Sequence, residues 1–164
     1  MDFKTYVEEF QQAADRLDEG LLVKKQVEVA VGTVLSSVFI KLYKKSWTSS
    51  FEDLLTAQSR IFFSVWINDR GIQEHKLFYN IHAFKLRHLP GYCIQSRKFA
   101  ECFRNSFKDF EHKWPNVSVQ FGPLTLMQGW VKIDLGNYQE EIIELADNFL
   151  AIEYLVDETL NHFK

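Results

Sequence analysis

The chain has 164 residues and a formal net charge of −3, with 46% hydrophobic and 25% charged residues. These values are ordinary for a soluble globular protein, and only seven Gly and three Pro exclude collagen-like and low-complexity chains. No apolar run approaches the ~20 residues that cross a bilayer, and no signal peptide is visible. We therefore expect a single domain over residues 1–164, a cytoplasmic location, no membrane association, and reduced thiols at Cys93 and Cys102.

The N-terminal part predicts a helix followed by an ambiguous segment. Residues 3–18 place their apolar side chains on one helical face, with Asp2 as the N-cap. Residues 21–35 fit a helical face, yet the alternation of valines over 27–31 also fits a strand. The helix is the favoured interpretation of 21–35, with the strand left open, and a strand is expected over 37–45.

The middle of the chain predicts a hairpin. Ser50 and Asp53 have the spacing of a capping box, which indicates a short helix at 51–58. Alternating apolar residues predict strands over 61–67 and 76–87, joined by a turn at Asn68–Gly71. Both strands carry apolar residues on their two faces, so we expect the sheet to be covered, at least partly, on both sides.

An aromatic-faced helix is expected next, over residues 97–113, with Ser96 as its cap and Pro115 at its end. Its aromatic stripe indicates a core-facing side, formed by Phe99, Phe103, Phe107 and Phe110. Short strands are expected from Val117 onward, over 124–127 and over 130–133. A long last helix begins near Asn137, which has the position of a cap.

This order of elements predicts an α+β fold. We expect an antiparallel sheet of about five strands with an N-terminal helical segment, the middle aromatic-faced helix and the long C-terminal helix packed on it. The strand order does not follow from the sequence. A nucleotide-binding doubly wound fold is not expected, because no strand–helix unit carries a glycine-rich turn.

A ligand pocket is one candidate site. Asn80 and His82 share a strand face between Phe78 and Phe84, and Trp66 lies on the matching face of the preceding strand. Polar side chains on a covered sheet face can line a pocket. The alternative, which the sequence favours, is a structural histidine with its hydrogen bonds satisfied.

Nucleic-acid binding is a second candidate. Arg97, Arg104 and Lys108 form a basic face on the middle helix, and Lys85 and Arg87 precede it. Such a stripe can bind phosphates. Glu101 and Glu111 have the spacing to pair with these cations, which favours an ordinary solvated face. On that interpretation Arg104→Ala is expected to cost little stability.

The C-terminal helix is a third candidate, as an interface. Its apolar arc is wider than one core-facing stripe needs, because Ala151, Tyr154 and Leu155 extend it. We expect a protein partner or a second copy of the chain to bind there, with Tyr154 as the anchor. Two carboxylates of this helix, Glu153 and Asp157, are four residues apart, and the sequence leaves open whether they are functional.

The sequence favours a small interaction domain that binds a protein partner or a second copy of itself. Residues 70–113 carry nine Lys or Arg against four acids, and residues 134–164 carry one Lys against eight acids, a dipolar pattern that suits docking. An enzyme is not favoured, because no nucleophile elbow, P-loop or helical zinc motif is present. No cofactor and no metal are expected. The alternatives are the basic helix as a nucleic-acid site and an enzyme or small-molecule pocket around His82.

Overall fold

The computed structural model describes residues 1–49 and 57–164. The elements are, in chain order, α1 (Phe3–Asp15), α2 (Glu19–Lys25), β1 (Glu28–Val34), β2 (Ser37–Tyr43), η1 (Lys45–Trp47), β3 (Arg60–Ile67), α3 (Asp69–Glu74), β4 (Lys76–Phe84), η2 (Leu86–His88), α4 (Ser96–Phe107), η3 (Glu111–Lys113), β5 (Thr125–Lys132), α5 (Gln139–Ile152) and α6 (Tyr154–Asn161). None of the helices in these two ranges has the length and apolar character to cross a membrane.

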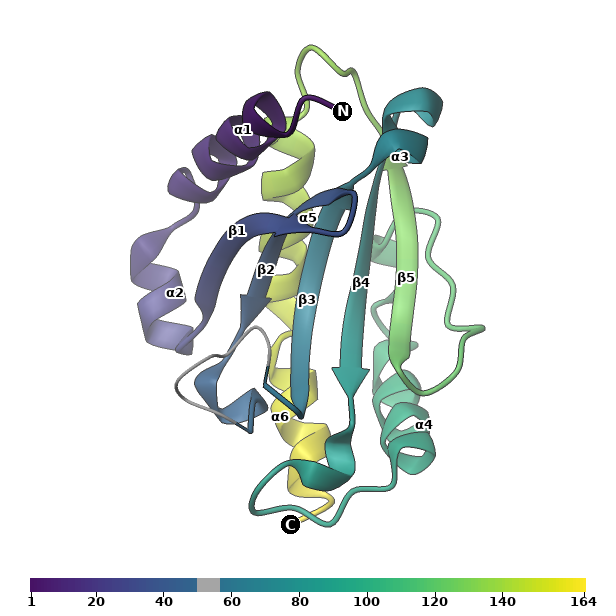
Figure 1. The fold of residues 1–164 in the computed structure, drawn as a ribbon. Coiled ribbons are helices and arrows are strands. Elements are labelled where there is room, and N and C mark those ends of the chain that lie inside the picture. Colours follow the sequence, from purple (N-terminus) through teal and green to yellow (C-terminus); the bar gives the residue numbers. More distant parts are fainter. Residues whose placement is uncertain (50–56) are drawn as a thin grey trace.

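The strands form one sheet in the order β1-β2-β3-β4-β5, and each strand is antiparallel to its neighbours. The predicted α+β fold with a five-stranded antiparallel sheet is confirmed. The N-terminal helix, the aromatic-faced helix and the C-terminal helical segment are all present (Figure 1).

One face of the sheet forms the core. In Figure 1, α4, α5 and α6 lie behind the strands. The core side chains of β3 and β4 alternate along each strand, as predicted, and all are buried: Ile61, Phe63, Val65, Ile67, Leu77, Tyr79, Ile81 and Ala83. Phe63 stacks on Phe149 of α5 with ring centroids 4.6 Å apart. Phe99, Phe103 and Phe107 of α4 are buried in the same core, which confirms the predicted stripe.

The opposite face of the sheet, called the open face below, is covered only in part among the described residues, which agrees with the expectation of at least partial cover on both sides. The short helix α3 packs at the end where Phe78 lies, and the tip of the β1–β2 hairpin turns over the centre. Phe39 and Phe78 are 5% and 8% exposed, whereas Phe62 and Trp66 are half-buried. A Cβ added at Gly71 of α3 would lie 3.3 Å from the Phe78 ring. Apolar residues on both faces of a strand are buried by a second layer only where such a layer exists. On this face the aromatic rings shield one another from solvent instead.

In the ambiguous segment 21–35, the structure has a helix only up to Lys25 and a strand from Glu28 onward. The helix favoured for 21–35 ends at Lys25, because Gln26 adopts a left-handed conformation (φ 59°). The Gln26 N–H donates to the Val23 carbonyl at 3.1 Å, and the Val27 N–H donates to the Leu22 carbonyl at 2.9 Å. The alternating valines then enter β1, where Val29 and Val31 pair with Leu42 and Ile40. The β-branched valines favour a strand, and pairing with β2 stabilises it, so this part of the segment is extended rather than helical.

One element of the hairpin region differs from expectation, and another is not tested. The predicted turn at 68–71 is the start of α3, because the Asn68 side chain accepts a hydrogen bond from the Gly71 N–H at 2.8 Å and caps the helix. The predicted helix at 51–58 lies almost wholly outside the described residues.

The strands predicted after the aromatic helix are corrected as well. The helix itself ends at Phe107, and η3 completes the segment. Ser118 forms only an isolated bridge to Gln128, and β5 runs unbroken through Gly129. This glycine is not a break: a Cβ there would lie 2.4 Å from the Tyr79 hydroxyl, which donates to the Pro115 carbonyl at 2.6 Å.

The C-terminal helix is interrupted. It begins at Gln139 rather than at Asn137, and Glu153 separates α5 from α6. Glu153 is only 4% exposed, so the interruption lies inside the protein.

Candidate functional site

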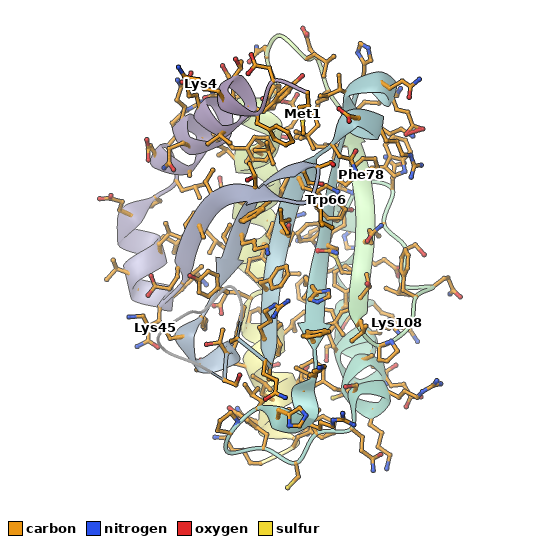
Figure 2. All side chains as sticks on the ribbon, viewed as in Figure 1. Met1, Lys4, Lys45, Trp66, Phe78 and Lys108 are labelled. Atoms are coloured by element: carbon orange, nitrogen blue, oxygen red, sulfur yellow. The ribbon has the colours of Figure 1, made fainter. Side chains whose placement is uncertain are left out.

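The strand register arranges the open face in rows. Phe39 of β2 pairs with Trp66 of β3, Trp66 pairs with Phe78 of β4, and Phe78 pairs with Trp130 of β5. Residues that are partners across a sheet point to the same face. An aromatic row therefore crosses four strands. Figure 2 shows Trp66 and Phe78 side by side on the near face, and their rings stack at 5.8 Å.

A polar row runs beside the aromatic row. Lys41 pairs with Ser64, Ser64 with Asn80, and Asn80 with Gln128. On its other side lie Phe62 and His82, which are partners across β3 and β4 with ring centroids 4.9 Å apart. Hydrogen-bonding groups are thus enclosed between two sets of rings.

A hollow of about 200 Å³ opens at the centre of these rows. It is lined by Val34, Ser37, Phe39, Lys41, Phe62, Ser64, Trp66, Asn80 and His82. Val34 and Ser37 come from the tip of the β1–β2 hairpin, which turns toward the near face of the sheet (Figure 1). The three residues of the sequence-predicted pocket, Asn80, His82 and Trp66, are brought together in this hollow. Its volume suits one ring system rather than a drug-sized molecule.

Cations lie over the rings of this face. The Lys41 ammonium is 4.4 Å from the centroid of Phe39 and 4.3 Å from that of Phe62. Arg60 lies over Phe84 at 4.8 Å, and Lys76 lies over Trp130 at 4.1 Å. Cation–π contacts of this kind hold a positive charge in place where no carboxylate does so.

The electrostatics of the hollow reflect burial. Desolvation, and then repulsion from Arg60, lowers the pKa of Lys41 to about 8. Desolvation, with repulsion from Arg60 and Lys41, lowers the pKa of His82 to about 4. His82 is therefore neutral at pH 7, whereas most of Lys41 is charged.

Two polar atoms of this face have no partner in the described part of the chain. The Asn80 carbonyl oxygen Oδ1 and the Arg60 Nε are both buried and accept or donate no hydrogen bond there. Buried polar groups are normally paired. Both atoms are fully buried, so neither is reachable by a ligand in this conformation.

The pKa of His82 leads to a prediction about pH. Because the folded-state pKa is about 4 and the ordinary value is 6.5, the unfolded chain binds the proton first as the pH falls. We expect the contribution of His82 to the free energy of unfolding to be complete above pH 6.5 and to be lost as the pH falls from 6.5 toward 4. NMR titration of the His82 ring protons should give a midpoint near 4, and His82→Phe should remove this part of the pH dependence. A midpoint near the ordinary value would show that His82 is solvated.

The basic helix is organised differently from the sequence expectation. Arg104 does not present a free cation: its guanidinium donates to the carbonyls of Phe121, Gly122, Thr125 and Leu126 at 2.8–3.1 Å. Arg97 and Lys108 are exposed on α4. Lys85 and Arg87 come from the segment after β4, where Lys85 lies over Phe84 at 5.3 Å. The predicted stripe therefore loses its central member to a structural role.

Arg104→Ala is accordingly expected to be costly, contrary to the sequence expectation. The substitution removes charge-assisted hydrogen bonds that fix the segment leading into β5, and we expect a loss of about 1.5–3 kcal/mol in the free energy of unfolding. Arg97→Ala, on an exposed position of the same helix, is the matched control and should change stability by less than about 0.5 kcal/mol. Chemical denaturation measures both. Equal effects would contradict the structural role of Arg104.

The predicted partner surface on the C-terminal helix is reduced. Leu155 is 3% exposed and belongs to the core, so it is closed to a partner of this folded chain. Tyr154 is 39% exposed and contacts Phe110 edge-on at 6.4 Å, and Ala151 is exposed. The wide apolar arc is explained mainly by packing within the chain. Self-association through Tyr154 and Ala151 stays a prediction.

Glu153 and Asp157 belong to an ion-pair cluster. The Lys44 ammonium lies 2.6 Å from a carboxylate oxygen of each, and Lys25 lies 3.3 Å from Glu153. The indole N–H of Trp47 donates to Asp157 at 2.8 Å. The cluster joins α2, η1 and Lys44, the residue that follows β2, to the C-terminal helices.

A larger hollow of about 510 Å³ lies between α2 and the end of β2, but its chemistry is less specific. It is lined mainly by Leu22, Val23, Val27 and Gln26 together with charged groups that already have partners. Lys44 is held by the cluster above, and Lys45 lies 3.8 Å from Glu28. The aromatic hollow is therefore the stronger candidate site.

Several residues of the open face were absent from the sequence-based site: Phe39 and Lys41 line the hollow, and Arg60 and Trp130 lie on the same face outside it. The alternation of β2 and β3 places them on the same face as Trp66, and this signal is present in the sequence once the strand order is known. Comparison with protein-family models, with curated proteins and with solved structures finds no match to this chain.

Proposed function

We propose that this chain is a binding protein for anionic ligands that carry planar rings, and that the open face of the sheet is its binding surface. One observation carries the proposal: Lys41 lies within 4.4 Å of two aromatic rings at the wall of the hollow, without an acidic partner in the described ranges. The two rings offset part of the desolvation of this cation, and an anionic ligand would offset more of it.

The planar part of the ligand follows from the rings. Phe62 and Trp66 are only half-buried, and both line the hollow. Aromatic rings prefer offset-stacked or edge-to-face partners, and a flat ring system of the ligand supplies such a partner. A flexible aliphatic chain would leave this preference unused.

The negative charge of the ligand follows from the composition of the face. The outward positions of β2, β3, β4 and β5 include Lys41, Arg60, Lys76 and Lys132 and contain no Asp or Glu. The protein as a whole is acidic, with a net charge of −3, so this face departs from the average of the molecule. Complementarity of potential favours an anion there.

Three small probes test the proposal by tryptophan fluorescence. 2-Naphthoate has both the ring and the charge, hexanoate has the charge alone, and 2-naphthylmethylammonium has the ring with the opposite charge. We expect 2-naphthoate to bind with a Kd of order 1 mM, as its size permits, and the other two to bind at least about tenfold more weakly, the difference that 1.4 kcal/mol makes.

Variants locate the binding surface. Lys41→Met keeps most of the side-chain volume but removes the charge, and we expect it to abolish naphthoate binding. Lys108→Met makes the same change on exposed α4 and should leave binding intact. Equal binding of all three probes, or naphthoate binding that survives Lys41→Met, would contradict the proposal.

A further inference from the structure

The open face extends well beyond the hollow. The aromatic row runs from β2 to β5, which is three strand spacings or about 14 Å. Of its four rings, those of Phe39 and Phe78 are only 5% and 8% exposed, whereas those of Trp66 and Trp130 are half-exposed. A single ring system fills the hollow at the β2–β4 side, next to Trp66, and leaves Trp130 without a ligand contact. The two half-exposed rings lie on β3 and β5, two strand spacings apart, and therefore suit a ligand with more than one ring.

The cations are distributed along the same direction. Lys41 lies over Phe39 and Phe62 at the β2–β3 side, and Lys76 lies over Trp130 at the β4–β5 side. Lys132 is the register partner of Lys76. Charges at both sides of an aromatic row match a polyanion whose negative groups are separated, rather than a ligand with one anionic group.

The polar row lies where the edges of stacked rings would be. Ser64, Asn80 and Gln128 form a line of hydroxyl and amide groups next to the aromatic row. Gln128 is half-exposed at the end of this line, and its side-chain amide offers both donors and an acceptor. The edge of a nucleobase carries groups of both kinds.

From these observations, and resting on the proposed function, we infer that the open sheet face binds single-stranded nucleic acid, with bases stacked on the half-exposed rings of Trp66 and Trp130 and the phosphates next to Lys41, Arg60, Lys76 and Lys132. Sheets that present aromatic rings on neighbouring strands stack two or three bases in this manner. A duplex is excluded from this mode, because its bases are already stacked on one another.

Fluorescence anisotropy with labelled ten-residue oligonucleotides tests the inference. The probes are oligo-dT, oligo-rU, a ten-base-pair duplex and, as a competitor, thymidine monophosphate. We expect one or both single strands to bind at least about tenfold more tightly than the mononucleotide and the duplex, because each additional stacked base contributes about a 5- to 150-fold gain. A preference between oligo-dT and oligo-rU identifies DNA or RNA as the source of the shared chemistry.

Salt dependence and variants identify the contacts. With four cations at phosphates, the slope of log K against log salt concentration should be about −3, and Lys76→Gln should make it less steep by about 0.7. Trp130→Ala should weaken oligonucleotide binding about 5- to 150-fold, yet leave 2-naphthoate binding in the hollow unchanged. Lys108→Gln on α4 is the matched control and should have no effect.

The failures of the two proposals are distinguishable. Oligonucleotides that bind no better than thymidine monophosphate, while 2-naphthoate still binds, would overturn the nucleic-acid inference and leave the binding face in place. Oligonucleotide binding that is lost in Lys108→Gln but kept in Trp130→Ala would also overturn it, because the surface would then be α4. If neither naphthoate nor any oligonucleotide binds, both proposals fail.

Discussion

Phe63→Ala is expected to lower the free energy of unfolding by roughly 3–5 kcal/mol, the usual cost of emptying a large buried aromatic site. Phe63 is completely buried and stacks on Phe149 with ring centroids 4.6 Å apart, and it also contacts Trp114 edge-on at 5.8 Å. The cavity would lie between β3 and α5, where the rigid sheet limits relaxation. Urea denaturation measures the loss.

Phe62→Ala is the matched control, because Phe62 is the preceding residue of the same strand and points to the open face. It is half-buried at the margin of the core, and its ring contacts His82 and Lys41. Its loss should be smaller, about 1 kcal/mol for partial burial and ring contacts. Losses of equal size for the two variants would contradict the division of the sheet into a core face and an open face.

Lys44→Met is expected to produce the second large loss, roughly 3–5 kcal/mol, because it removes one partner of a buried ion pair. The side chains of Lys44 and Glu153 are only 12% and 6% exposed, and Glu153 would retain only Lys25 at 3.3 Å. Lys45→Met changes the neighbouring exposed lysine and should cost less than about 1 kcal/mol. Thermal denaturation of the two variants gives the comparison, and a small loss for Lys44→Met would show that water reaches Glu153.

The same cluster makes the free energy of unfolding depend on pH in the alkaline range. Burial by itself would lower the pKa of Lys44, but hydrogen bonds and attraction from Asp157 and Glu153 outweigh burial and raise the pKa above its ordinary value of 10.5. A raised lysine pKa stabilises the folded state below the unfolded value. The contribution of Lys44 should therefore be intact at neutral pH and be lost only as the pH rises above 10.5.

The core face was predictable because its signal is local. Alternation in β3 and β4 identifies Phe63 and Tyr79 as inward residues, and the helical spacing of Phe99 and Phe103 identifies the buried side of α4. The residues at which helices and strands end were less predictable. Gln26 ends a helix through a left-handed backbone, and the sequence does not distinguish it from an ordinary helical glutamine.

The candidate site was predictable only in part. Asn80 and His82 are two residues apart on one strand, so their common face follows from the sequence alone. Lys41 and Trp130 are far from Asn80 and His82 in the sequence, and only the register of β2 and β5 brings them to that face. The role of Arg104 was predicted wrongly for a related reason. Its acceptors are backbone carbonyls of a distant segment. Every residue has a carbonyl, so the sequence does not indicate which ones Arg104 contacts.

The most direct measurement is chemical-shift mapping of 2-naphthoate on the uniformly ¹⁵N-labelled protein. If the open sheet face is the binding surface, the largest shifts should fall within 37–41, 62–66 and 78–82, and residues 97–108 of α4 should be unaffected. Shifts concentrated on α4, or no shifts at ligand concentrations of several times about 1 mM, the Kd that the size of the probe permits, would contradict the account.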